Sequence, residues 1–287
     1  MRAASDLARL IVSCPDRHGI IATLSACLAG NGANIVTSDQ HSTDPEKGAF
    51  FLRMEFHLAE LEKRRSELEE QLASIAREFK MHWRLTPANE KKRVAVFVSR
   101  HEHCMLDLLW RWRRNELDID VVAVVSNHPD LETEVARFGV PYYHHPVSST
   151  TKAQAEQQTL DLLGGGVDVI VLARYMQILS GDFLREIDAP VINIHHSFLP
   201  AFAGADSHAR AYERGVKLIG ATAHYVTEDL DEGPIIEQGV SRVSHRQDVD
   251  ELVRLGRDIE RMVLARAVRW HIEDRILVHG SRTIVFR

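Results

Sequence analysis

The pattern of hydrophobic and polar positions changes at a polar stretch, residues 87–92. Before this stretch, short apolar runs alternate with segments in which apolar residues recur every three or four positions. The first pattern predicts strands and the second predicts helices. We therefore expect strands at 10–13, 34–41, 49–58 and 81–85, and helices at 20–28 and 60–80.

This order of elements is that of a ferredoxin-like α+β domain. The two middle strands flank a run of turn formers at residues 44–48, so we expect them to form a hairpin. Asp16 precedes the first helix and is expected to cap its N-terminus. We assign the first domain to residues 1–86 and a linker to residues 87–92, because the linker is polar and begins with a proline.

After the linker, apolar runs alternate with helical segments. We expect strands at 93–99, 119–126, 141–145, 167–173 and from 191 onward, with helices at 106–114, 131–138 and 151–163. A strand at 235–243, a helix at 249–272 and a hairpin at 275–286 follow without evident chemistry. This alternation predicts a parallel sheet covered on both faces, a doubly wound, Rossmann-like α/β domain over residues 93–287. Such domains bind ligands beyond the carboxyl ends of their strands.

Polar side chains interrupt an apolar run at Asn193 and His195. Side chains alternate along a strand, so these two are expected to face the same way. A second strand-like run, residues 222–226, leads into an acidic loop from which Asp231 is expected to reach back towards them. An amide, an imidazole and a carboxylate together suit attack on a carbonyl with proton transfer. Asn193 would hold the oxyanion and His195 would donate at the reaction centre, while Asp231 would orient His195, position the attacking water, or do both.

The first β-to-α turn of the second domain, residues 99–104, contains no glycine. A phosphate or dinucleotide cradle needs close backbone approach at that point, and this turn does not provide it.

Composition narrows the choice of partner and compartment. The formal net charge of -6 argues against nucleic acid as a partner. Cys14, Cys27 and Cys104 are odd in number and widely spaced, which favours a reducing, cytoplasmic setting over a disulfide framework. Neither a signal-peptide core nor a membrane-spanning apolar run is present, so no membrane partner is expected. The histidine pairs lie in separate segments without a His-Glu-x-x-His helix, so we expect no metal site.

The segment Cys14-Pro15-Asp16-Arg17-His18-Gly19-Ile20, followed by Gly-Ala-Asn-Ile at residues 32–35, resembles ACT domains, small modules that often bind amino acids. This resemblance implies an amino-acid effector, methionine or glycine, with Asp16, Gly19 and Asn34 as regulatory residues. A module that only assembles the protein is the alternative, since fold does not fix function. Either way the sheet edges favour a homo-oligomer.

Three blocks of the second domain, residues 193–200, 220–224 and 231–236, resemble the folate-dependent formyl hydrolase and transferase family. With the ACT-like module in front, residues 8–287 resemble the members that hydrolyse formyltetrahydrofolate to tetrahydrofolate and formate. The resemblance implies a hydrolase acting on a linear amide C–N bond, with Asn193, His195 and Asp231 as the catalytic trio. It also implies that folate is the substrate, that no cofactor is required, and that the enzyme supplies formate for purine synthesis and balances one-carbon folate pools.

The same resemblance assigns a pterin pocket to residues 173–180 and a closing loop to residues 227–231. The substrate-binding residues it implies are Arg174, Met176, Gln177, Ile178, Leu179, His196, Thr227, Glu228, Asp229 and Leu230. His196 stands where transferases of this family commonly have proline, so it either satisfies a buried hydrogen bond or helps to hold the hydrolytic water. His224 is expected to face inward and support the site.

Two other functions are open on these residues. A formyltransferase would use the same trio with an amine acceptor; the glycine-free turn disfavours an acceptor that carries a phosphate, and the acidic charge disfavours tRNA. A catalytically silent folate or amino-acid sensor is the other, but a sensor need not keep Asn193, His195 and Asp231, and all three are present. Water is therefore the preferred acceptor.

Overall fold

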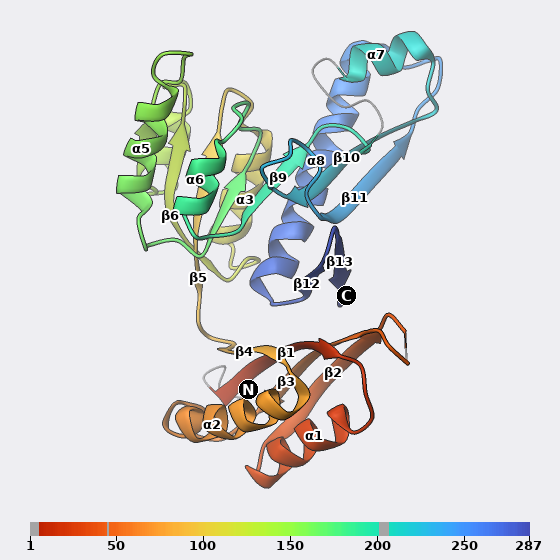
Figure 1. Cartoon of the computed structure of the whole chain (residues 1–287). Helices are drawn as coiled ribbons and strands as arrows, with labels where there is room; N and C mark the ends of the chain where they lie inside the picture. The colour runs from red at the N-terminus through yellow and green to blue at the C-terminus, as the bar shows by residue number, and fades with distance from the viewer. Residues whose placement is uncertain (1–5, 45, 201–206) are drawn as a thin grey trace. The chain divides into compact units, whose positions relative to one another are not determined.

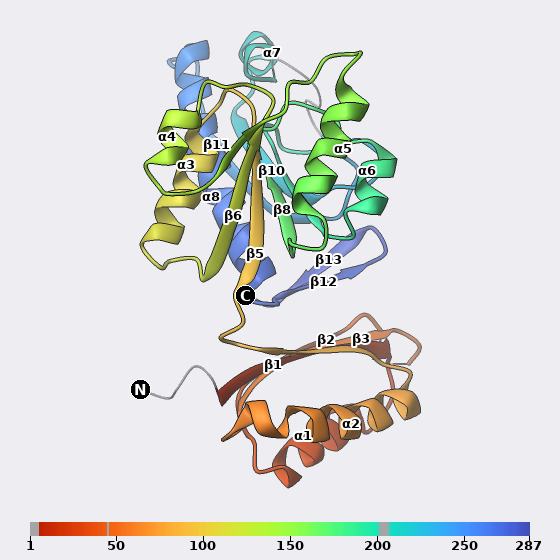
Figure 2. The same ribbon diagram turned by 90° about the vertical axis from the view of Figure 1, so that its left-hand side faces the viewer.

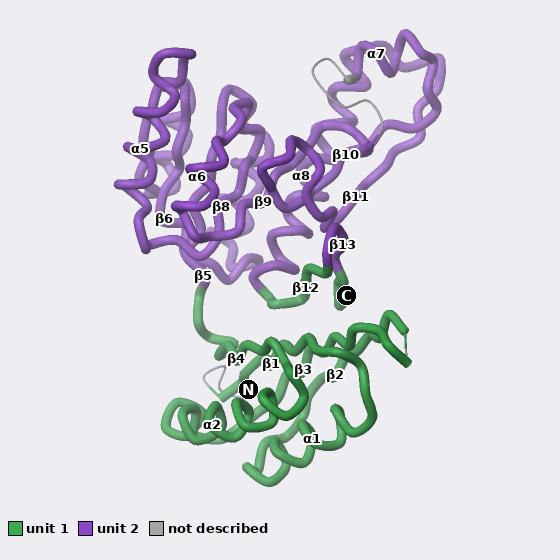
Figure 3. Tube along the Cα trace, viewed as in Figure 1, with its two compact units in different colours: residues 1–91, 273–279, 284–287 green, residues 92–272, 280–283 purple. Residues whose placement is uncertain are grey.

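The computed structural model describes residues 6–44, 46–200 and 207–287 (Figure 1). The chain forms two compact units (Figure 3). The first contains residues 1–91, 273–279 and 284–287, and the second contains residues 92–272 and 280–283. None of the described helices is both long and apolar enough to cross a membrane.

The first unit is a four-stranded antiparallel sheet with two helices on one face (Figures 1 and 2). Its elements are β1 (Leu7–Pro15), α1 (Ile20–Gly30), β2 (Asn34–Ser42), β3 (Ala49–His57), α2 (Leu61–Phe79) and β4 (His82–Pro87), and the strand order is β2-β3-β1-β4. Alternate residues of β1, among them Leu10 and Val12, pack in the core with the helices. The ferredoxin-like α+β fold predicted from the pattern is confirmed.

The start of α1 differs from the prediction. Gly19, with φ of 91°, is the residue before the helix, and no side chain caps it. Asp16 instead accepts a hydrogen bond from the hydroxyl of Ser42, at the end of β2. The reason is that β1 runs to Pro15 and Gly19 then turns the chain in a left-handed conformation, which leaves Asp16 too far ahead of the helix to cap it.

The last residues of the chain group with the first unit. The hairpin of β12 (Ile276–His279) and β13 (Arg282–Val285) forms where the sequence indicates one. Leu277 and Phe286 pack with Ile11 and Phe51, on the face of the sheet away from the helices. Asp274 is buried and lies 2.5 Å from Nη2 of Arg84. The domain division from sequence placed all of 275–286 in the second domain, because a hairpin pattern does not reveal the surface on which it packs.

The second unit is a seven-stranded sheet between two layers of helices (Figure 2). Its strands are β5 (Lys92–Val98), β6 (Ile119–Ser126), β7 (Tyr142–His144), β8 (Val169–Leu172), β9 (Val191–His195), β10 (Leu218–Tyr225) and β11 (Ile235–Arg242), in the order β11-β10-β9-β8-β5-β6-β7. On one face lie α5 (Lys152–Leu163) and α6 (Gly181–Glu186), and on the other α3 (His103–Arg113), α4 (Glu132–Ala136) and α8 (Val249–Ile272). The doubly wound α/β class is confirmed.

Two features of this sheet go beyond the prediction. The predicted parallel pairing is confirmed for the strands from β5 to β9, but β10 pairs antiparallel with both β9 and β11, because in the described part of the chain no helix that crosses back over the sheet separates β10 from β11. The helices α6 and α7 (Ser207–Arg214) were not predicted, because α6 has only six residues, capped by Ser180, and α7 has only eight residues and no large aliphatic side chain that would mark an apolar face. Since the order of strands reverses at β5, polar side chains that follow β8, β5 and β9 meet at one edge of the sheet.

Candidate active site

Asn193 and His195 lie at the carboxyl end of β9, and because they are two residues apart their side chains point to the same face of the strand. His195 is buried, with 7% of its surface exposed, and its Nδ1 lies 3.2 Å from Oδ2 of Asp231. The carboxylate can only accept a hydrogen bond, so Nδ1 carries the proton and Nε2 is free to act as a base in the neutral ring. Among the described residues, Nε2 has no hydrogen-bond partner although it is buried. The imidazole is therefore held at one nitrogen and open at the other.

Asp231 reaches His195 because the loop after β10 is tightly folded. Asp231 itself has φ of 58°, and two residues later Gly233 passes against the backbone of Tyr225. A Cβ at position 233 would lie 1.7 Å from the carbonyl oxygen of Tyr225, so only glycine fits there. The hydrogen bond from His195 is the main reason why the pKa of the Asp231 carboxyl lies well below its usual range. The carboxylate is thus charged beside His195 throughout the neutral range.

His224 fixes the amide of Asn193. It pairs with Asn193 across β9 and β10, and it is 2% exposed. Its Nδ1 lies 2.9 Å from the carbonyl oxygen of Tyr225, so Nδ1 carries the proton and Nε2 accepts a hydrogen bond from Nδ2 of Asn193 at 3.2 Å. One amide hydrogen of Asn193 is used in this contact. The other remains for an oxyanion.

A cavity of about 310 Å³ opens beside these groups. Asn193, His195 and Asp231 line this cavity. Nearly all of the substrate-binding residues expected from sequence line it as well: Arg174, Met176, Gln177, Ile178, Leu179, His196, Thr227, Glu228 and Leu230. Asp229 lies in the same loop but does not line the cavity. Met176, Ile178 and Leu230 are each more than half exposed, so they are not core residues, whereas Leu179 is partly buried and packs against the core of the second unit. Such an apolar rim suits a flat aromatic ligand.

The segment after β8 is attached to the turn after β5. The hydroxyl of Ser99 accepts a hydrogen bond from the backbone N–H of Met176 at 3.0 Å and lies 2.6 Å from Oδ1 of Asn127. The backbone N–H of Ser99 donates to the carbonyl of Arg174 at 3.2 Å. These contacts place the start of the cavity-lining segment at the point where the strand order reverses, which explains why the site forms there.

His196 is not where strand alternation would put it. The strand β9 ends at His195, so the next side chain is free to turn, and the two rings stack with centroids 5.1 Å apart. Burial, followed by the charge of Arg174, lowers the pKa of His196 to about 4. His196 is therefore a neutral ring beside the catalytic candidates at neutral pH.

Tyr175, within the segment 173–180 that the sequence assigns to the pterin pocket, lines the cavity and packs edge-on against Phe97, and burial raises its pKa to about 12. The sequence missed other residues of the site: Leu172, Ile194 and Val226 also line the cavity. Their only signal in the sequence is adjacency to the expected segments. Glu260 is the largest omission: it is 2% exposed in α8, a helix whose pattern indicated packing alone, and no local motif marks it.

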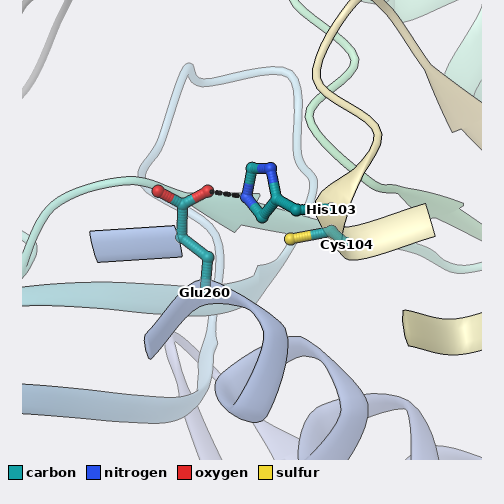
Figure 4. A group of neighbouring side chains, drawn as sticks. All are labelled: His103, Cys104 and Glu260. Carbon is teal, nitrogen blue, oxygen red and sulfur yellow. Dashed lines mark hydrogen bonds and ion pairs between the residues drawn. The ribbon is translucent and has the colours of Figure 1, made fainter. Parts of the chain in front are cut away.

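One group of potential metal ligands occurs among the described residues: His103, Cys104 and Glu260 (Figure 4). Glu260 already contacts Nε2 of His103 at 2.8 Å and Nε of Arg174 at 3.5 Å. Burial raises the pKa of the Cys104 thiol well above its usual value. The carboxylate of Glu260 is already paired with His103 and Arg174, and the positive charge of Arg174 disfavours a cation here.

The expected regulatory residues lie in the first unit. Asp16 is bonded to Ser42, Gly19 precedes α1 with its left-handed backbone, and Asn34 is the exposed first residue of β2. They are near the two ends of α1.

Comparisons with known proteins agree with this architecture. A family model described as formyl transferase matches residues 92–268, and one described as ACT domain matches residues 8–77. The chain is 57% identical over 283 residues to the formyltetrahydrofolate deformylase of Mycobacterium tuberculosis (strain ATCC 25618 / H37Rv), covering 98% of this chain and 91% of that relative. It is 53% identical over 282 residues to the deformylase of Bacillus subtilis (strain 168), covering 98% and 94%. The crystal structure of a formyltetrahydrofolate deformylase from Pseudomonas syringae pv. tomato superposes with a TM-score of 0.92 at 50% identity, over 98% of this chain and 94% of that one.

Proposed function

Because the chain belongs to the formyltetrahydrofolate deformylase family, we propose that it hydrolyses formyltetrahydrofolate to tetrahydrofolate and formate at the cavity beside Asn193, His195 and Asp231. The observation that carries this proposal is the state of His195. Its Nδ1 is held by Asp231 while its buried Nε2 faces no partner among the described residues.

His195 moves the proton in the proposed reaction. Nε2 takes a proton as the oxygen of water bonds to the formyl carbon, and Asp231 stabilises the resulting imidazolium. The same nitrogen then gives the proton to the folate nitrogen as the C–N bond breaks. Formic acid leaves and loses its acidic proton to become formate. Of the two roles open to Asp231, the 3.2 Å contact with Nδ1 supports the orientation of His195.

Asn193 stabilises the oxyanion. When water attacks, the formyl oxygen gains negative charge, and the amide hydrogen of Asn193 that His224 does not use is available to it. His224 acts through Asn193: it holds the amide in one orientation before the substrate binds, so no reorganisation is needed during the reaction. The contact with Asn193 agrees with the expectation that His224 positions the site and takes no direct part in the reaction.

The pterin ring occupies the cavity lined by residues 174–179 and closed by Thr227, Glu228 and Leu230. Gln177 supplies a polar contact and the exposed apolar side chains of Met176 and Ile178 supply the faces. We leave Asp229 out of this set because it does not line the cavity. The proposed chemistry uses only side chains of the chain, so no cofactor is required.

Hydrolysis and transfer to an amine differ only in the acceptor. The glycine-free turn after β5 contains no backbone cradle for a phosphate-bearing acceptor, which supports water. The test is formate release from formyltetrahydrofolate with purified protein and no added acceptor. Formate release that is as fast without an amine as with one supports the proposal. A strict requirement for an amine would identify a transferase.

The first unit adds assembly and regulation to the proposal. Its sheet has β2 and β4 at the edges, and edges of this kind pair between protomers, which supports a homo-oligomer. Methionine or glycine would act near Asp16, Gly19 and Asn34. Titration of each amino acid during turnover tests this: a rate change that Asn34→Ala removes supports regulation, and insensitivity to both leaves assembly alone.

The cellular setting follows from the reaction. An enzyme that releases formate supplies it for purine synthesis and balances the one-carbon folate pools. The three cysteines are free thiols, which fits a reducing, cytoplasmic compartment. Loss of the gene product is expected to cause a formate or purine requirement, measured by growth with and without formate.

A further inference from the structure

A second cavity, of about 240 Å³, lies next to the folate cavity. Arg174 and His196 line both. The rest of its wall comes from other elements: His101 and His103 in and after the turn that follows β5, His208 of α7, and Arg257 and Glu260 of α8. Nothing in the proposed binding of the pterin uses this space.

The guanidinium of Arg174 is the main charge on the wall of the second cavity. Its side chain is 11% exposed, and its Nε lies 3.5 Å from Oε2 of Glu260, a residue that lines only the second cavity. The charged end of Arg174 is therefore on that side. Nε faces Glu260 as an ion pair without a hydrogen bond, and Nη1 of Arg174 is buried with no hydrogen-bond partner among the described residues. Buried guanidinium donors are costly to leave without acceptors, so an acceptor from a ligand is expected.

Glu260 neutralises only one of the two arginine charges on the wall of the second cavity. Burial alone would raise its pKa, but the hydrogen bond with His103 and the charge of Arg174 outweigh burial, and the pKa lies below its ordinary value. Its carboxylate is shared between Arg174 and His103, as Figure 4 shows for the His103 contact. Arg257, which is exposed at the rim, adds a second positive charge. One carboxylate facing two guanidinium groups leaves room for a monoanion, whereas a dianion would be repelled by Glu260.

A row of imidazole rings joins the two cavities. His195 and His196 stack with centroids 5.1 Å apart, and His196 and His208 stack with centroids 6.3 Å apart. His195 lines only the folate cavity and His208 only the second one. A small molecule formed at Nε2 of His195 would therefore meet His196 on its way to Arg174.

We propose that the second cavity binds formate, with the guanidinium of Arg174 as its anchor and His196 between it and the reaction centre. The proposal deepens the proposed function and rests on it, because formate is the product that forms beside His195. A planar carboxylate matches the fork of guanidinium donors, and formate is a monoanion. Formate would then occupy the second cavity while tetrahydrofolate occupies the folate cavity.

The test is the binding of ¹³C-labelled sodium formate to the full chain, followed by NMR line broadening at constant ionic strength and without folate. Saturable broadening is expected, with neutral formamide unable to compete. Arg174→Met should weaken formate binding by at least about tenfold, the factor for one charge-assisted hydrogen bond. Arg254→Met is the control for loss of an arginine charge, because Arg254 is an exposed arginine of α8, the helix that carries Glu260, and it pairs with Glu251 and lines neither cavity.

Arg174→Met leaves the buried carboxylate of Glu260 without its arginine partner, which can destabilise the protein. A loss of formate binding in this variant must therefore be distinguished from a loss of folding. The double variant Arg174→Met with Glu260→Gln removes both charges together, and it should melt near the wild type and still fail to bind formate. Binding that survives in a folded double variant overturns the proposal, as does the absence of saturable binding in the wild type.

Saturating tetrahydrofolate fills the folate cavity, and so shows in which of the two cavities formate binds. Formate should stay bound when tetrahydrofolate is present, and complete displacement would place formate in the folate cavity and overturn the proposal. Because binding is measured without turnover, the two claims fail separately. A protein that hydrolyses formyltetrahydrofolate but binds no formate contradicts the second cavity alone, and one that binds formate through Arg174 but releases none from the substrate supports the cavity while contradicting the proposed function.

Discussion

At the scale of single residues, the two nitrogens of His195 have opposite surroundings. Nδ1 faces the carboxylate of Asp231 at 3.2 Å, and Nε2 is buried without a partner among the described residues. The sequence predicts that Asn193 and His195 share a strand face, since period two is a property of any strand. It does not predict that His196 stacks on His195 or that His224 holds Asn193, because both depend on where β9 ends and how β10 pairs with it.

His195→Ala should lower kcat by about 10²–10⁴-fold, because the proton carrier is lost. Folate should still bind, since the apolar rim of the cavity is unchanged. The measurement is steady-state formate release together with folate binding by fluorescence. His245→Ala serves as the control, because His245 is exposed and lines neither of the two cavities. A near-normal kcat for His195→Ala would remove this residue from the mechanism.

Asp231→Asn should destabilise the protein at neutral pH and much less in acid. The folded-state pKa of Asp231 is lowered by the hydrogen bond from His195, so its contribution to stability is present above the unfolded carboxyl pKa of about 3.9. That contribution is lost as the pH falls through the folded pKa. Urea unfolding should therefore show a gap between wild type and variant that narrows below about pH 4. Asp229→Asn, in the same loop and exposed, should show no such gap; a gap for Asp231→Asn that is independent of pH would contradict the ion pair.

At the scale of elements, the loop between β10 and β11 determines whether Asp231 meets His195. The acidic composition of this loop and its Gly233-Pro234 ending indicate a turn, and that much is visible in the sequence. The close approach of Gly233 to the backbone of Tyr225 is not, because it depends on the antiparallel direction of β10 and β11. The antiparallel pairing of β10 and β11 is likewise the part of the sheet in which the predicted parallel pairing is wrong.

Gly233→Ala should shift this loop, because its Cβ would lie 1.7 Å from the carbonyl oxygen of Tyr225. A displaced Asp231 should reduce kcat by about 10²-fold, the cost of a misplacement of about 1 Å. Kinetics and thermal melting of the purified variant measure both effects. Glu232→Ala, at the exposed neighbouring position, should leave kcat within a small factor of the wild type. Equal kcat for the two variants would show that the loop does not place Asp231.

At the scale of the whole molecule, the order of elements predicts both fold classes, because each class is set by local periodicity and short connections. The sequence does not predict where the C-terminal segment packs. Leu277 and Phe286 contact Ile11 and Phe51, which are more than two hundred residues away along the chain. Glu260 escapes prediction for the same reason: its buried carboxylate is significant only beside Arg174 and His103, which other elements supply.

Phe286→Ala should weaken the first unit and spare the second. Phe286 is 7% exposed and packs with Ile11 and Phe51, and truncation of such a side chain costs about 3 kcal/mol. Hydrogen exchange read by mass spectrometry should show faster exchange in β1 and β3 than in the wild type, with β5 and β6 unchanged. Arg282→Ala, exposed in the same hairpin, is the control. Unchanged exchange in β1 would mean that the C-terminal segment does not stabilise this sheet.

The source of the second oxygen of formate tests the central claim most directly. Turnover of formyltetrahydrofolate in H₂¹⁸O, without any amine acceptor, should give tetrahydrofolate and formate that carries one ¹⁸O atom, detected by mass spectrometry. The other oxygen comes from the formyl group and stays unlabelled. Failure to form labelled formate, or formyl transfer to an added amine as the only reaction, would contradict water as the nucleophile at His195.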